Sequence, residues 1–190
     1  MLLNLKLMII KNNNPRIEPS FSFKNRIYRF IWYIIQDTLF KFSPRTFYNY
    51  RNFILKIFGA QIGTNTHINR KVKIWAPNNL VIGNEVGIGD NVNLYSMDKI
   101  QIDDYTVISE GAFICTGSHD YNSYNFQLFT KPIRIETKTW ICAEVFIHPG
   151  VIISEGVVVG ARSVVTKNLD EAWSVYAGNP VLKIKSRIKN

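Results

Sequence analysis

Three histidines and two cysteines are the residues of this 190-residue chain whose chemistry covers proton transfer, nucleophilic attack and metal binding. Cys115 and Cys142 lack the CxxC spacing of a zinc site, and two isolated cysteines make no disulfide framework. His119 lies in the run Ser-His-Asp-Tyr, inside a polar stretch over residues 116–131. Because imidazole titrates near neutral pH, it can take a proton from an attacking hydroxyl and return it to a leaving group. His119 is therefore our candidate general base; the alternative is a loop histidine that only caps a turn.

The elements that must position His119 are indicated by an aliphatic residue at every sixth position on both sides of the polar stretch. This first row consists of Ile62, Ile68, Ile74, Ile82, Ile88, Leu94, Ile102, Ile108, Ile114, Ile135, Ile141, Ile147, Ile153, Val159 and Val165. A second row, two residues earlier, consists of Val72, Leu80, Val86, Val92, Ile100, Ala112, Ile133, Val145, Val151 and Val157. A period of six fits neither a helix nor an ordinary strand, but it fits a three-sided coil with one short strand per side. The pattern predicts an all-β parallel β-helix of about five triangular coils over residues 59–168.

The polar stretch itself is predicted to be a protruding loop over residues 116–131, which leaves the coil at His119 and returns at Pro132. Long loops on rigid scaffolds often carry function. We therefore expect this loop to hold His119 at the side of the solenoid.

The positive charge of the chain belongs to its N-terminal region. The formal net charge is +9, and residues 1–58 contain ten Lys and Arg residues against Glu18 and Asp37. Apolar residues at helical spacing predict one helix over residues 23–40 and a second over about residues 44–58. Two interpretations remain open. The helices cover the open end of the solenoid, or their basic, aromatic-rich surface rests on an anionic membrane.

The remaining segments set the expected boundaries and location. Residues 169–190 form an extension after the repeat, with a basic tail that we expect to be helical. No segment reaches the roughly 20 apolar residues needed to span a bilayer, and the apolar start MLLNLKLMII has no small-residue cleavage site. We therefore expect a cytoplasmic protein, which lies at the inner face of the membrane under the second interpretation of the N-terminal helices. No nucleic-acid partner is expected, because no recognised binding fold accompanies the charge.

Several longer segments resemble a known family. The six-residue repeats, or hexads, are similar to those of the hexapeptide-repeat acyltransferases, whose fold is a left-handed β-helix. The resemblance extends to the SHDY loop and to the segments ETKTWICAEVFIHPGV, VVVGARSVVTK and AGNPVLKIK. Within that superfamily, the chain looks most like the colanic-acid and exopolysaccharide biosynthesis O-acetyltransferases, on the segments SFSFKNR, FGAQIG, VKIWAPNNLVIG and GAFICTGSHDY. This resemblance covers about residues 20–187. It implies an enzyme that transfers an acetyl group from acetyl-CoA to a sugar hydroxyl in surface-polysaccharide biosynthesis.

The resemblance also implies roles for individual residues. It makes His119 the base, and it places the acceptor sugar at Asn93, Tyr95, Asp98 and Asp120. It places CoA in a groove at Trp140, Ala143, Ala161, Thr166, Lys167 and Lys185. Small side chains at positions 143 and 161 would let the pantetheine arm approach the backbone, and the lysines would meet phosphates; ordinary surface lysines are the alternative. Glycine is common in relatives where Cys142 stands here.

The family further implies a homotrimer, because each active site needs two chains, and an acceptor that is nucleotide-linked, lipid-linked or free. A small-molecule acetyltransferase is the alternative enzyme, and a non-catalytic solenoid scaffold is the remaining alternative. His67 and His148 invite a zinc site with His119, but they belong to different coils and cannot easily converge on one ion. We therefore expect no metal.

Overall fold

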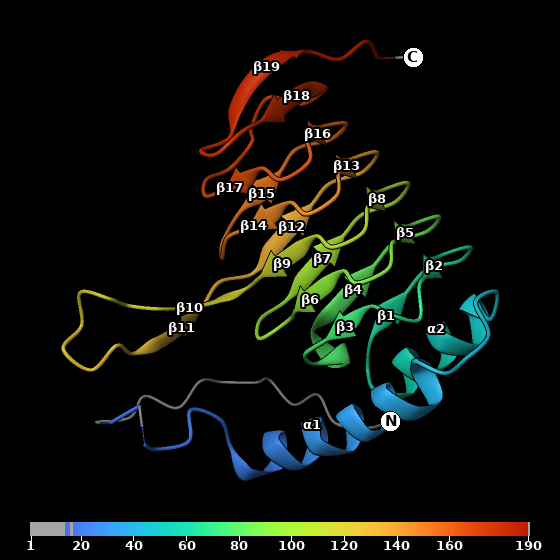
Figure 1. The fold of residues 1–190 in the computed structure, drawn as a ribbon, viewed down its shortest axis with the longest axis vertical. Coiled ribbons are helices and arrows are strands. Elements are labelled where there is room, and N and C mark those ends of the chain that lie inside the picture. The colour runs from blue at the N-terminus through green and yellow to red at the C-terminus, as the bar shows by residue number, and fades with distance from the viewer. Residues whose placement is uncertain (1–13, 16, 190) are drawn as a thin grey trace.

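The computed structural model of the protein describes residues 14, 15 and 17–189, in which short strands stack into a three-sided parallel solenoid (Figure 1). Sheet A contains β1 (Gln61–Ile62), β4 (Leu80–Ile82), β7 (Ile100–Ile102), β12 (Ile133–Ile135) and β15 (Ile152–Ile153). Sheet B contains β2 (His67–Ile68), β5 (Gly87–Ile88), β8 (Val107–Ile108), β13 (Trp140–Ile141), β16 (Val158–Val159), β18 (Ser174–Ala177) and β19 (Leu182–Ser186). Sheet C contains β3 (Lys73–Ile74), β6 (Asn93–Tyr95), β9 (Phe113–Cys115), β14 (Phe146–Ile147) and β17 (Val164–Val165).

The six-residue repeat forms the core of this solenoid, as predicted. Ile62, Ile82 and Ile102 pair in register along sheet A, and Ile135 follows Ile102. Every member of the first row is buried. Because one aliphatic side chain per strand points inward, successive coils add to three columns that pack against one another along the whole length.

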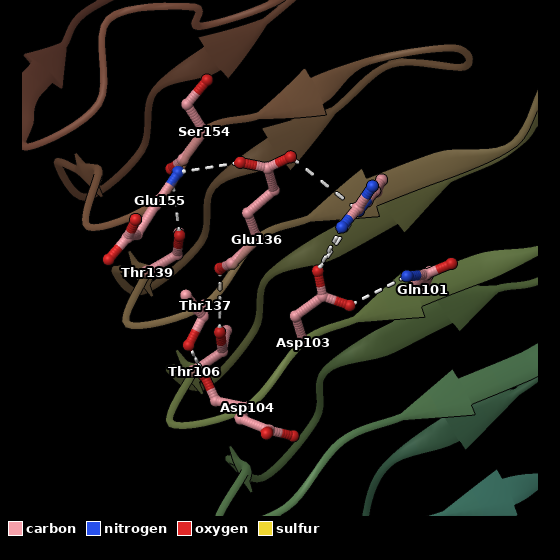
Figure 2. A network of polar contacts seen from close by, with 10 residues as sticks. Gln101, Asp103, Asp104, Thr106, Glu136, Thr137, Thr139, Ser154 and Glu155 are labelled. Carbon is pink, nitrogen blue, oxygen red and sulfur yellow. Dashed lines mark hydrogen bonds and ion pairs between the residues drawn. The ribbon is translucent and has the colours of Figure 1, made fainter.

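The second row is buried as well, and threonines stand in its place at one corner, before three strands of sheet B. Thr66, Thr106 and Thr139 stand two residues before a first-row position, and each hydroxyl donates a hydrogen bond to a carbonyl of the next coil. Figure 2 shows two of these threonines beside Glu136, whose carboxylate accepts a hydrogen bond from the Glu155 N–H at 3.2 Å. These contacts tie the third, fourth and fifth coils together at that corner.

Two N-terminal helices cover the open end of the first coil (Figure 1). They are α1 (Phe23–Ile35), which continues as the π-helical turn η1 (Gln36–Phe40), and α2 (Tyr48–Ile57). Ser22 caps α1, accepting a hydrogen bond from the Asn25 N–H at 3.3 Å. The second helix begins four residues later than predicted. Ser43, which precedes it, is buried, and its hydroxyl accepts a hydrogen bond from the Arg51 guanidinium.

The covering helices satisfy backbone groups that the first coil would otherwise leave without partners. The Trp32 indole N–H donates to the Ile74 carbonyl at 2.8 Å, and Arg51 Nε donates to the Ile68 carbonyl at 2.7 Å. Asn52 Nδ2 donates to the Thr66 carbonyl at 2.7 Å. An exposed sheet edge is a template for unwanted strand pairing. Because α1 and α2 occupy backbone groups at this edge, the predicted role of the helices as a cap is confirmed. In the part of the chain that the structure describes, no helix has the length and apolar character needed to cross a bilayer.

The polar stretch forms a hairpin that projects from the side of the solenoid (Figure 1). Its strands are β10 (Gly117–His119) and β11 (Leu128–Thr130), and they pair antiparallel with His119 opposite Leu128. A short 3₁₀ turn, η2 (Pro77–Asn79), occupies the lengthened corner of the first coil. The hairpin takes the place of the corner between β9 in sheet C and β12 in sheet A.

The expected helix in the C-terminal extension is wrong. Residues 174–177 add a further strand, β18, parallel to β16, and β19 folds back antiparallel onto β18. Leu182, Lys183, Ile184 and Lys185 alternate apolar and basic side chains, which is a strand period rather than a helical one. The open edge of sheet B offers backbone hydrogen bonds to such a segment, and these decide its conformation.

Candidate active site

A cavity of about 370 Å³ lies where α1, the end of β6 and the projecting hairpin meet. The side chains that line it and matter for chemistry are Arg26, Arg29, Tyr95, Met97, Ser118 and His119. Three segments far apart in the sequence thus contribute to one concave site. Its volume lies within the range usual for small-molecule sites.

The hairpin holds the neutral ring of His119 in one tautomer. Its Nδ1 lies 2.7 Å from the Phe126 carbonyl oxygen across the turn. Because a carbonyl oxygen can only accept, Nδ1 carries the proton in the neutral ring and Nε2 keeps its lone pair. The side chain is exposed and lines the cavity. This arrangement suits a general base, since the lone pair of Nε2 remains available to a bound hydroxyl.

The four predicted acceptor residues are placed differently from one another. Tyr95 lines the cavity with His119, and burial raises the pKa of its hydroxyl, which therefore stays protonated and can donate a hydrogen bond. Asn93 lies two residues earlier on the same side of β6, outside the cavity lining. The Asp98 carboxylate accepts a hydrogen bond from the Lys99 N–H at 2.7 Å. Asp120 holds the hairpin turn by accepting from the Asn122 N–H at 3.0 Å. The structure thus brings Tyr95 to His119 and gives Asp98 and Asp120 local backbone contacts.

Two of the predicted CoA residues are stacked at the corner between sheets B and C. Ala143 follows β13 and Ala161 follows β16, and the Arg162 N–H donates to the Ala143 carbonyl at 2.9 Å. Among the residues that the structure describes, neither alanine N–H donates a hydrogen bond. Small side chains and free amides fit a ligand that pairs its own amides with the backbone.

The other predicted CoA residues are more widely spread. Trp140 is 48% exposed on β13, and its indole N–H donates to the Ser109 hydroxyl at 3.0 Å. Thr166 and Lys167 are exposed just after β17, whereas Lys185 is exposed on β19. No contact between any of these residues and His119 is found in the described part of this single chain.

Sequence reasoning missed the cationic wall of the cavity. Arg26 and Arg29 lie three residues apart on α1, so they share one side of the helix. Their clustering is visible in the sequence. The fact that they line one cavity with His119 is not visible there, because it depends on how α1 crosses the end of the solenoid.

The remaining histidines and cysteines have structural surroundings. His67 stacks on Tyr48 with ring centroids 4.3 Å apart, and His148 meets the Phe146 ring edge-on at 5.0 Å. Burial raises the pKa of both the Cys115 and the Cys142 thiol. Within residues 14, 15 and 17–189, no group of three or more His, Cys, Asp or Glu side chains is placed to hold a metal ion.

Comparison with known proteins places this architecture among acetyltransferases. No family model matches the chain. It is 44% identical over 159 residues to WcaF of Escherichia coli (strain K12), which is assigned as a colanic acid biosynthesis acetyltransferase; the match covers 84% of this chain and 87% of that protein. The hexapeptide-repeat acetyltransferase VCA0836 of Vibrio cholerae superposes with a TM-score of 0.81 at 23% identity, covering 88% of this chain and 95% of that one. AntD, an N-acyltransferase of Bacillus cereus solved with dTDP and 3-hydroxybutyryl-CoA, gives a TM-score of 0.60 at 29% identity, covering 72% and 88%.

Proposed function

We propose, since this chain belongs to the family of hexapeptide-repeat acetyltransferases that includes WcaF, that it is an acetyl-CoA-dependent O-acetyltransferase. Its acceptor is a sugar hydroxyl in the biosynthesis of a surface polysaccharide. The fold, a left-handed parallel β-helix with an N-terminal helical cap, is shared with the acetyltransferase structures that superpose on it.

The observation that carries this proposal is the state of the His119 ring in the cavity. With Nδ1–H engaged by the Phe126 carbonyl, Nε2 accepts the proton of the acceptor hydroxyl as its oxygen attacks the thioester carbonyl. The carbon–sulfur bond then breaks, the acetyl group stays on the acceptor oxygen, and the proton passes from Nε2 to the departing thiolate. The free amide N–H of Ala143 is our candidate for stabilising the oxyanion that forms between these two steps.

CoA would be held along the stacked corner and the exposed strands beside it. Ala143 and Ala161 give the pantetheine arm close access to the backbone, and Thr166, Lys167 and Lys185 supply the polar and cationic contacts for its phosphates. Trp140 would border this groove. AntD, which shares the fold, was solved with an acyl-CoA, and this supports a CoA thioester as the donor.

The test is an acetyl-transfer assay with His119→Asn and a matched control. Thiol release from acetyl-CoA is measured against a panel of free, nucleotide-linked and lipid-linked sugars. We expect His119→Asn to lower kcat at least about 100-fold, because the acceptor hydroxyl loses its general base. The midpoint temperature of thermal unfolding should stay unchanged. The control is His148→Asn, which changes a histidine outside the cavity and should keep wild-type activity. Full activity of His119→Asn would contradict the mechanism.

Two other functions are less well supported. A small-molecule acetyltransferase shares the fold, but the 44% identity to WcaF over most of both chains favours a polysaccharide precursor as the acceptor. A scaffold without activity would not need a histidine held in one tautomer beside a cavity. The acceptor panel distinguishes these alternatives.

The assembly and location that we propose follow from how the site is divided. His119 lies on the hairpin between sheets C and A, whereas Ala143 and Ala161 lie at the corner between sheets B and C. A homotrimer of parallel solenoids would bring one chain's histidine to a neighbour's groove. In the cytoplasm, the exposed apolar side of α1 would rest on the inner face of the membrane and give access to lipid-linked acceptors.

A further inference from the structure

The cavity at His119 contains two positive charges that the proposed transfer step does not use. Arg26 and Arg29 line it, and no Asp or Glu is among the lining residues. The four ion pairs recorded in the described residues lie on the later coils and the C-terminal strands, and neither arginine takes part in one. Two cations in a concave site without a counter-charge make a site of positive potential.

Arg29 is held in place by contacts that leave its charge uncompensated. Its Nε donates to Asn25 Oδ1 at 2.8 Å, its Nη1 donates to the Tyr33 hydroxyl at 3.5 Å, and its guanidinium lies 4.3 Å from the centre of the Trp75 ring. Asn25 is itself buried beneath the helix. A guanidinium stacked on an aromatic ring and held through two of its nitrogens loses little further entropy when an anion binds at the third, here Nη2. Arg29 is therefore prearranged for an anionic ligand.

Arg26 supplies a second, less constrained charge one turn earlier. Its side chain is exposed, and its guanidinium lies 5.5 Å from the centre of the Phe23 ring. At 100° per residue, Arg26 and Arg29 lie between the buried side of α1 and its exposed apolar side. The two arginines on α1 would thus bind an anion in the cavity on the side opposite the hairpin that carries His119.

We propose that Arg26 and Arg29 form a phosphate subsite, so that the acceptor is a phosphorylated sugar whose hydroxyl reaches His119. This inference rests on the proposed function and names its substrate class. Two arginines match the near-double charge of a phosphate ester, or a diphosphate, better than the single charge of a sugar carboxylate. A neutral sugar would leave both arginines uncompensated. Sugar nucleotides and lipid diphosphate saccharides share this chemistry.

Direct binding of pyrophosphate tests the subsite without any knowledge of the sugar. Calorimetry is performed on the full chain with saturating CoA, so that phosphate contacts in the CoA groove are already occupied. We expect Arg26→Gln to weaken pyrophosphate binding about tenfold, the usual value of a hydrogen bond to a charged group. The control Lys24→Gln removes the same charge from the same helical turn outside the cavity, and it should bind as the wild type does. No binding, or equal loss in both variants, would overturn the proposal.

Acetyl transfer then separates failure of the subsite from failure of the proposed function. Glucose and galactose are compared as free sugars and as their 1-phosphates, without vesicles. We expect kcat/KM to be higher for the phosphates than for the free sugars, and Arg26→Gln to remove that difference. Transfer to free and phosphorylated sugars with equal kcat/KM would refute the subsite and leave the acetyltransferase intact. Transfer to no acceptor would refute the function, while the calorimetry still decides the subsite.

Two further arms distinguish the sources of the phosphate. UDP-glucose in solution is compared with a polyprenyl diphosphate glucose in phosphatidylglycerol vesicles. In either arm, dependence on Arg26 supports the subsite, and the arm with the higher kcat/KM identifies the source. If glucuronate alone shows Arg26 dependence, the subsite binds a carboxylate and the phosphate proposal is wrong.

Discussion

At the scale of single residues, the site depends on which nitrogen of His119 is free. The Phe126 carbonyl fixes Nδ1, and this contact exists only because the hairpin turn returns the chain to the ring. Tyr95 adds a hydroxyl that burial keeps protonated. One acceptor of a proton and one donor of a hydrogen bond thus line the same cavity, which is the minimum needed to orient and activate a sugar hydroxyl.

The two cysteines should be poor nucleophiles. Burial raises the pKa of both thiols above its ordinary value, so the reactive thiolate is scarcer at neutral pH than in a free thiol. We expect iodoacetamide to alkylate Cys142 more slowly than glutathione at pH 7.5, with the rate increasing as pH approaches the raised pKa. Cys115, which is buried, should react more slowly still. Peptide mass spectrometry over a pH series measures both rates; alkylation of Cys142 faster than glutathione would contradict the expectation.

At the scale of elements, α1 performs two tasks on different sides. Its inner side closes the first coil through Trp32, whereas its outer side exposes Phe23, Ile27, Phe30, Ile31 and Ile34 at helical spacing. Surface helices of soluble proteins usually present polar residues to water. The exposed apolar side, together with the basic N-terminal region, is what an interfacial helix needs.

We therefore expect substitutions on the outer side of α1 to remove membrane binding. Glutamine is a good helix former, so Phe30→Gln and Ile34→Gln change the apolar surface of α1 and not its helicity. Each should weaken co-sedimentation with phosphatidylglycerol vesicles by about tenfold, the order expected for one buried large side chain. Removal of residues 1–58 is a blunter test, since it would also remove Trp32 and Leu55 and so uncover the core of the first coil.

The matched controls for this experiment are on the C-terminal strand. Leu182→Gln and Ile184→Gln change side chains that are 62% and 61% exposed, comparable to Phe30 at 66%. They should bind vesicles as the wild type does. Equal loss in these variants, or unchanged binding of Phe30→Gln, would show that α1 is only a cap.

Most of the solenoid could be predicted from the sequence, because a period of six is a direct consequence of one inward side chain per strand. Ile102 and Ile135 belong to one sheet although the hairpin separates them, and their positions in the hexads indicate this. The C-terminal strands could not be predicted in this way. The residues of β19 belong to no hydrophobic core, and their conformation is set by backbone bonds to β18.

The candidate site could be predicted only in part. His119 was identifiable from its loop, and Tyr95 from the resemblance to the family. Arg26 and Met97 were not, since they reach the cavity only when α1 crosses the end of the solenoid and β6 ends beside the hairpin. Such contacts depend on the packing angle of a helix, which no short pattern encodes.

At the scale of the whole molecule, the solenoid acts as a rigid frame with different chemistry at each end. The basic helices and the cavity lie at the first coils, and the two antiparallel C-terminal strands close the far end (Figure 1). Three continuous columns of aliphatic side chains join these ends. The distances between corners are therefore fixed within one chain, and the homotrimer that we propose would combine the hairpin of one chain with the groove of a neighbour.

Mixing of two inactive variants tests this division of the site. Ala161→Trp should block the CoA groove of its own chain while leaving His119 intact, and His119→Asn leaves the groove open. If each site takes its histidine from one chain and its groove from a neighbour, unfolding and refolding the two variants together in equal amounts should restore about a quarter of wild-type activity. Analytical ultracentrifugation should show trimers for both variants and for the mixture. Each variant refolded alone is the control and should stay inactive. A mixture as inactive as its components, in trimers shown by mass spectrometry to contain both chains, would place the whole site within one chain.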